Sequence, residues 1–131
     1  MRLRNAGIAL VLLHLLVTIP HSIAHTNLGI DMSQWQNVYI YLVILLAPIV
    51  AGVLLWRRSR SGFLVLVVSM AGSFLFGVLY HFVLSGADNA MTLHPHPWTM
   101  TFQVSAVLLA LVELAGAVTG FIGTKQMSDT L

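Results

Sequence analysis

Four long apolar runs decide what this chain can fold into. Each holds about 20 residues or more, which is the length at which a helix crosses the hydrocarbon core of a bilayer. Because the backbone has no water partners there, each run must form a helix or join a closed barrel. The continuous rather than alternating apolar pattern indicates helices. They are expected at about residues 5–24, 36–56, 62–84 and 98–123, with a kink at Pro48 in the second.

The composition agrees with a membrane protein. Hydrophobic residues make up 58% and charged residues 8% of the 131 positions, whereas a soluble domain carries about 25% charged residues. A chain of this length forms one unit, so residues 1–131 are predicted to be a single all-α integral membrane domain, a four-transmembrane-helix antiparallel bundle. Its main partner is the lipid bilayer. No nucleic acid partner is expected, because the few basic residues lie at helix ends.

The basic residues predict the orientation of the bundle. All six precede the first run, lie between the second and third runs, or follow the fourth, so a four-pass chain places them on one side. The positive-inside rule makes that side cytoplasmic, and we expect N-in, C-in topology in the cytoplasmic membrane of a bacterium or archaeon. The residues are Arg2, Arg4, Arg57, Arg58, Arg60 and Lys125.

The first run also has features of a signal peptide. Two arginines precede it, and Ser22 and Ala24 fit a small-x-small cleavage site. Cleavage after Ala24 would leave His25 as an N-terminal residue that chelates copper through its amine and ring. We expect a retained helix instead, because the charge pattern makes this run the first of four spans.

A group of histidines is predicted at the outer side of the membrane. His21 and His25 end the first helix one turn apart, His81 ends the third, and His94 and His96 lie in the loop before the fourth. Neutral imidazole is the commonest biological metal ligand, and without cysteine the site suits copper, iron or zinc. The leading hypothesis is a redox-linked metal-binding membrane protein. Its candidate ligands are His21, His25, His81, His94, His96 and Asp88.

Two other functions fit the same residues. In the first, haem b lies between the first and third helices, with His21 or His25 and His81 as axial ligands and Gly77 giving room for the macrocycle. In the second, the chain is a non-catalytic accessory or scaffold subunit whose histidines cap helices. A bundle this small has little room for a large pocket, so we expect a homo-oligomer or other membrane subunits as partners. Whether the protein is an enzyme is open.

A second polar feature is predicted deeper in the membrane. His14 lies on the same face of the first helix as Thr18, His21 and His25, and Glu113 is the only acidic residue within a span. Counting 1.5 Å per residue from the helix ends places His14 and Glu113 at a similar depth. We therefore expect a buried His14–Glu113 pair, which acts as a proton relay, as an anchor behind the metal site or as a structural clamp.

Overall fold

The computed structural model describes residues 1–128 and confirms an all-α four-helix bundle. Each helix is long and apolar enough to span a membrane. The orientation of the bundle in the membrane remains a prediction, which rests on the positions of the basic residues. The four spans are α1, Arg2–Asn27; α2 with η1 and α3, Gln34–Trp56; α4 with η2, Ser61–Val83; and α5, Thr99–Ser128.

The second and third spans each contain a π-helical segment. The second runs through α2 (Gln34–Tyr39), η1 (Ile40–Leu46) and α3 (Ala47–Trp56). The third runs through α4 (Ser61–Val78) and η2 (Leu79–Val83). Such wide turns are rare and often occur at functional sites.

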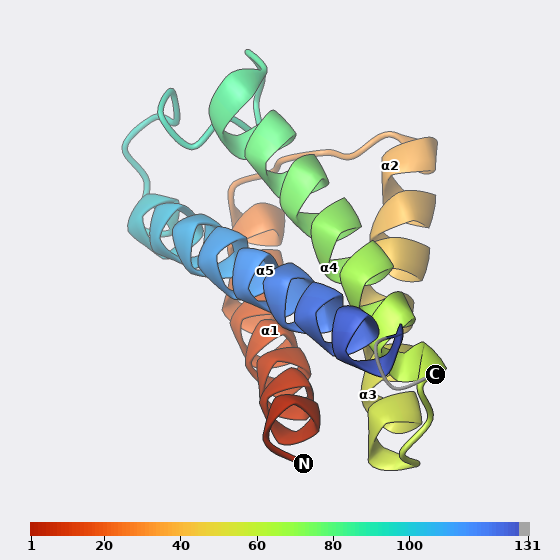
Figure 1. Cartoon of the computed structure of the whole chain (residues 1–131). Coiled ribbons are helices and arrows are strands. Elements are labelled where there is room, and N and C mark those ends of the chain that lie inside the picture. The colour runs from red at the N-terminus through yellow and green to blue at the C-terminus, as the bar shows by residue number, and fades with distance from the viewer. Residues whose placement is uncertain (129–131) are drawn as a thin grey trace.

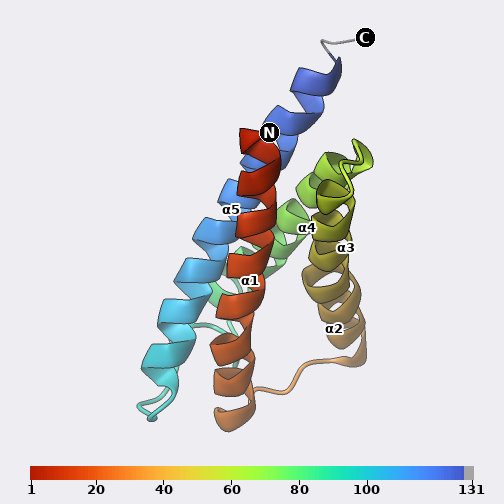
Figure 2. The ribbon, with the colours of Figure 1, turned by 90° about the horizontal axis from the view of Figure 1, so that it is seen from below.

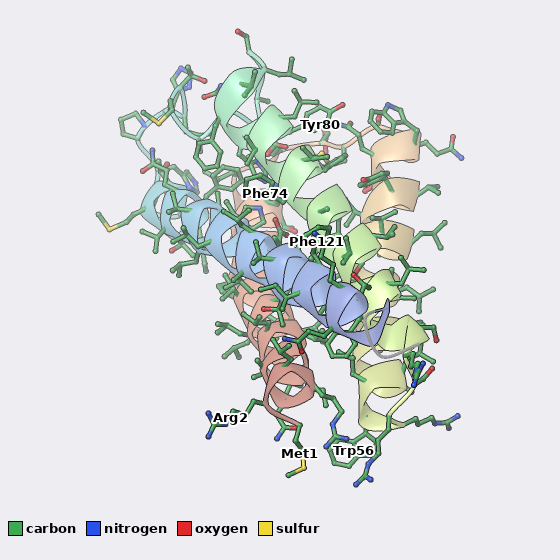
Figure 3. The ribbon with its side chains drawn as sticks, in the orientation of Figure 1. Met1, Arg2, Trp56, Phe74, Tyr80 and Phe121 are labelled. Atoms are coloured by element: carbon green, nitrogen blue, oxygen red, sulfur yellow. The ribbon has the colours of Figure 1, made fainter. Side chains whose placement is uncertain are left out.

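Both described ends of the chain lie at the same end of the bundle as the turn between α3 and α4 (Figure 2). We call this the arginine end, after the basic turn 57–60, and the opposite end, with loops 28–33 and 84–98, the histidine end. Arg2 and Trp56 lie toward the arginine end and Tyr80 toward the histidine end (Figure 3). The helices therefore alternate in direction, as an antiparallel bundle requires.

Helix α5 packs along both α1 and α4, and α3 packs against α1 and α4. In Figure 1, α5 crosses in front of α1 and α4. Toward the histidine end the second span moves away from α1, and the coil joining α1 to α2 crosses the space between them (Figure 2). The bundle is thus closed around its arginine end and more open at its histidine end.

Small residues let the helices approach closely at the arginine end. The buried core there comprises Val11, Ala51, Leu55, Leu66 and Met70. A Cβ added at Gly120 would stand 2.9 Å from the Val67 backbone nitrogen, which leaves no room for a side chain. Membrane helices gain stability from such contacts, because no hydrophobic effect drives them together inside lipid.

Pro48 explains the π-helical segment before it. A proline has no N–H to donate to the carbonyl four residues earlier, and its ring crowds that carbonyl. That carbonyl belongs to Ile44, which lies in η1, and it is 2.9 Å from His14 Nε2 of α1. The predicted disturbance at Pro48 therefore takes the form of a π-helical segment. The carbonyl that receives no N–H from the proline is bonded instead by His14 of another helix.

Candidate metal centre

Three histidines meet at the histidine end of the bundle. His21 and His25 come from α1 and His81 comes from η2, and one ring nitrogen from each lies within 4.8 Å of the others. His21 is 7% exposed and His81 is 6% exposed, while His25 is half-buried. A buried group of three imidazoles with converging nitrogens can hold a metal ion.

Helix geometry and aromatic packing hold the three rings together. His25 follows His21 by four positions, so both rings lie on one face of α1 with their centroids 4.9 Å apart. The His81 ring lies 4.9 Å from that of His21 and 5.7 Å from that of His25. Phe102 of α5 stacks on His21 with a centroid distance of 4.9 Å and an interplanar angle of 27°. An aromatic ring therefore bounds the cluster on its α5 side.

Asp88 places a carboxylate beside two of these histidines. Its Oδ1 lies 3.2 Å from His25 Nε2 and 3.1 Å from His81 Nδ1. Both carboxylate oxygens are buried, and neither makes a hydrogen bond of good geometry. A buried carboxylate that contacts two imidazoles and has free lone pairs can orient the ligands or join them around an ion.

The loop 84–98 carries Asp88 inward by folding back on the bundle. Ala90 N donates to the His81 carbonyl at 2.9 Å, and Gln103 Nε2 donates to the Ala90 carbonyl at 2.7 Å. Ala90 is 1% exposed and packs against Ala24 and Phe102. The buried segment of this loop is therefore the one around Asp88.

The structure does not bring His94 and His96, the other two predicted ligands, into the cluster. Both side chains are exposed. His96 Nδ1 instead accepts a hydrogen bond from the Trp98 backbone N–H at 3.3 Å. Pro95 and Pro97 stiffen this stretch, which passes over the surface after the loop has left the bundle interior.

Ser105 orients His21, and the sequence reasoning missed it. Its Oγ donates to the Thr101 carbonyl at 2.6 Å, so it is left to accept from His21 Nδ1 at 2.9 Å. Neutral imidazole then keeps its lone pair on Nε2, the nitrogen free to bind an ion. The one available signal was that Ser105 is among the few polar residues of the fourth apolar run.

A cavity of about 490 Å³ extends from the histidines toward the middle of the bundle. His21, His25 and His81 line one part of it, and Ser73 and Glu113 line another. Gly77 lies between the two parts: a Cβ added there would stand 3.8 Å from both His81 Cδ2 and Glu113 Oε2, an ordinary contact distance. The histidine cluster and Glu113 therefore face the same cavity.

The predicted deep pair lies within contact distance. His14 Nδ1 is 3.4 Å from Glu113 Oε1, and both side chains are almost fully buried. His14 Nε2 is held by the Ile44 carbonyl at 2.9 Å. Polar groups buried at this depth in a membrane are costly and for that reason usually functional.

The arrangement of the rings suits a single ion better than haem. Two histidines that ligate one haem lie on opposite faces of the macrocycle. Here the His21 and His81 rings contact each other directly, edge to face, with centroids 4.9 Å apart. No flat group fits between them. Around an ion, three nitrogens at about 2.0–2.1 Å meet with no such spacer.

No known protein family, no curated protein and no solved structure matches this chain. A bundle of four helices hosts many unrelated functions, so fold alone does not indicate a function. The function must therefore be inferred from the chemistry of the buried histidines and their neighbours.

Proposed function

We propose that the protein binds one transition metal ion through His21, His25 and His81, and that this ion is copper or iron in a redox-linked role. The observation that supports this proposal most is the convergence of three buried imidazole nitrogens within 4.8 Å. Three separate side chains from two elements meet there. A single buried histidine would be weaker support for a metal site.

The donor set narrows the choice of metal. Imidazole nitrogens with one carboxylate nearby and no thiolate suit copper, iron and zinc. Copper(II) forms the most stable complexes of the divalent first-row metals, and two histidines with a carboxylate are a known ligand set for non-haem iron. His25 and His81 have a carboxylate beside them, since Asp88 Oδ1 lies within 3.2 Å of a ring nitrogen of each. Both metals change oxidation state, which supports a redox role.

Residues next to the three histidines orient them for metal binding. Ser105 fixes the orientation of His21, and Asp88 contacts the other two imidazoles. Such partners raise the basicity of the ligands and reduce their freedom to rotate. A bound copper or iron ion would supply one-electron chemistry, and with one such site among residues 1–128 the protein would need an electron-transfer partner. We propose a second copy or another membrane subunit in that role.

Metal analysis of protein purified without a polyhistidine tag tests the proposal. We expect about one copper or iron per chain, with the His81→Ala variant empty and the exposed His94→Ala variant loaded as the wild type. Zinc alone would refute the redox role and leave the metal site standing. A Soret band would indicate haem, and the absence of any metal would leave an accessory subunit.

The site is proposed to face the outer side of the cytoplasmic membrane, in line with the position of the basic residues. The chain has no cysteine, so single cysteines can be introduced at Ser85 in the histidine-end loop and at Ser61 near the arginine-end turn. In intact cells, a membrane-impermeant maleimide should label the Ser85→Cys protein and spare the Ser61→Cys protein. The reverse labelling would place the site on the cytoplasmic side.

A further inference from the structure

The cavity below the histidines has the features of a small-molecule site. Its volume of about 490 Å³ lies within the range of roughly 300–1,000 Å³ typical of ligand pockets. Its walls include the apolar and aromatic side chains Ile44, Phe76 and Leu109. Polar residues also line it: away from the exposed rim, the histidine cluster lies at one place and Ser73 with Glu113 at another, and such groups fix the orientation of a ligand.

One of these polar groups has no partner among residues 1–128, which the structure describes. Ser73 is 1% exposed and lines the cavity, and its Oγ makes no hydrogen bond. Leaving a buried hydroxyl unpaired costs free energy, so native proteins seldom do so. Glu113 lines the same cavity. A ligand oxygen placed there would satisfy Ser73 and contact the carboxyl group.

The exposed residues that line the cavity fall into two groups, one near the histidine-end loop and one deeper, between α1 and the second span; the first group is Thr26, Gly29, Asp31 and Asn37. Ser22 on α1 and Tyr41 on η1 form the second group and are exposed on the outside of the bundle. Counted from the helix ends at Asn27 and Gln34, these residues lie roughly 8–10 Å into their spans at 1.5 Å per residue. In a membrane the deeper of these two groups faces lipid, which gives an apolar ligand a path from the bilayer.

We propose that the cavity binds a lipid-soluble quinol or quinone, with the ring between the histidine cluster and Glu113. Such a ring is flat and apolar and carries an oxygen at each of two opposite edges. One oxygen is placed at Ser73 and Glu113 and the other toward the histidines, with the apolar tail leaving between α1 and η1. The choice of a redox-active ring rests on the proposed redox-active ion, whereas the binding itself does not need the ion.

Gly77 gives a direct way to block this site. A Cβ added there would lie 3.8 Å from both His81 and Glu113, so the longer side chain of leucine would extend into the space between them. Ala115→Leu adds similar bulk on the exposed face of α5 and serves as the matched control. Ser73→Ala removes a hydroxyl without breaking an internal hydrogen bond. Its control is Ser69→Ala, because Ser69 is bonded to the Leu66 carbonyl and lies outside the cavity lining.

Quenching of Trp35 fluorescence by decylubiquinone, and by its reduced form, measures the binding. The Trp35 ring lies 6.2 Å from that of Phe76, which lines the cavity, and the other two tryptophans are replaced by phenylalanine. We expect saturable binding of one molecule per chain, weakened at least tenfold by Gly77→Leu. Loss of one neutral hydrogen bond in Ser73→Ala should weaken binding about fivefold. Ala115→Leu and Ser69→Ala should leave the affinity unchanged.

Three results would overturn the proposal: quenching that does not saturate, equal affinities for Gly77→Leu and Ala115→Leu, or a co-purified phospholipid that decylubiquinone does not displace. Metal content is measured on the same preparations. Quinone binding by a protein that takes up no metal would refute the proposed metal function alone. A loaded metal site in a protein that binds no quinone would refute the cavity proposal alone.

Discussion

The two ends of the bundle are built in opposite ways. At the arginine end, glycines bring α5 against α4 and apolar side chains fill the space between helices. At the histidine end, the buried groups include imidazoles, a carboxylate and a serine hydroxyl, and a cavity separates α1 from the second span. The arginine-end half of the molecule is therefore packed for stability, whereas the histidine-end half retains polar groups that packing alone does not require.

The largest effect is expected at the histidine end. Loss of a second-sphere partner lowers metal affinity about 10- to 100-fold, and loss of a direct ligand costs more. His81→Ala should therefore weaken metal binding by more than about 100-fold, measured by competition with a chromophoric chelator. The helical content should be unchanged, because the arginine-end core is untouched. Equal affinity for His81→Ala and the surface variant His96→Ala would mean that the two ends do not differ in function.

The matching test at the arginine end uses stability. Gly120→Ala places a methyl group 2.9 Å from the Val67 backbone nitrogen, which cannot rotate away. Overpacking of this kind costs about 1–3 kcal/mol of unfolding free energy. Gly77→Ala meets only ordinary contacts and should stay within about 0.5 kcal/mol of the wild type. Reversible unfolding in detergent micelles measures both, and equal losses would contradict the proposed division of the bundle.

Asp88 tests how much the loop contributes to the histidine end. Asp88→Asn keeps the size of the side chain and removes the negative charge beside His25 and His81. We expect metal affinity to fall about tenfold, measured in the same chelator competition. Asp31→Asn, at the exposed rim of the cavity, is the charge-matched control. Similar losses in both variants would point to a general effect of surface charge.

The smallest effect is expected where the two halves meet. In Glu113→Gln, the side-chain amide can donate to His14 Nδ1 from the same position. We expect the unfolding free energy to change by less than about 0.5 kcal/mol and the metal content to stay at the wild-type level. A large loss of metal would show that the deep pair is part of the metal site.

Much of the fold could be predicted from the sequence, because in lipid a long apolar run has few alternatives to a helix. The first and last residues of the helices were less predictable. Helix α1 extends to Arg2 and Asn27 because polar residues can complete the turns outside the apolar run. The π-helical turns of η1 and η2 leave no simple pattern in a continuously apolar segment. Only Pro48 signalled a disturbance in advance.

In the candidate site, the sequence predicted the positions of residues on helices but not those of residues in loops. The topology predicts that three histidines lie near one another, because their helices end on the same side of the bundle; these are His21, His25 and His81. The path of residues 84–98 does not follow from the topology, because the bonds that Ala90 makes with the His81 carbonyl and the Gln103 side chain decide which part turns inward. Those bonds bury Asp88 and leave His94 and His96 outside. Ser105 was missed because its role depends on contact with another helix.

The carbonyl that Pro48 leaves free has a consequence for the deep pair. The Ile44 carbonyl can only accept, so His14 Nε2 must be the donor and carries the hydrogen. In neutral imidazole Nδ1 is then a lone pair, and it faces a carboxyl oxygen of Glu113 at 3.4 Å. Two acceptors repel each other unless a proton lies between them. The pair therefore retains one proton and zero net charge, and a proline one helix away sets the tautomer of a histidine in the middle of the membrane.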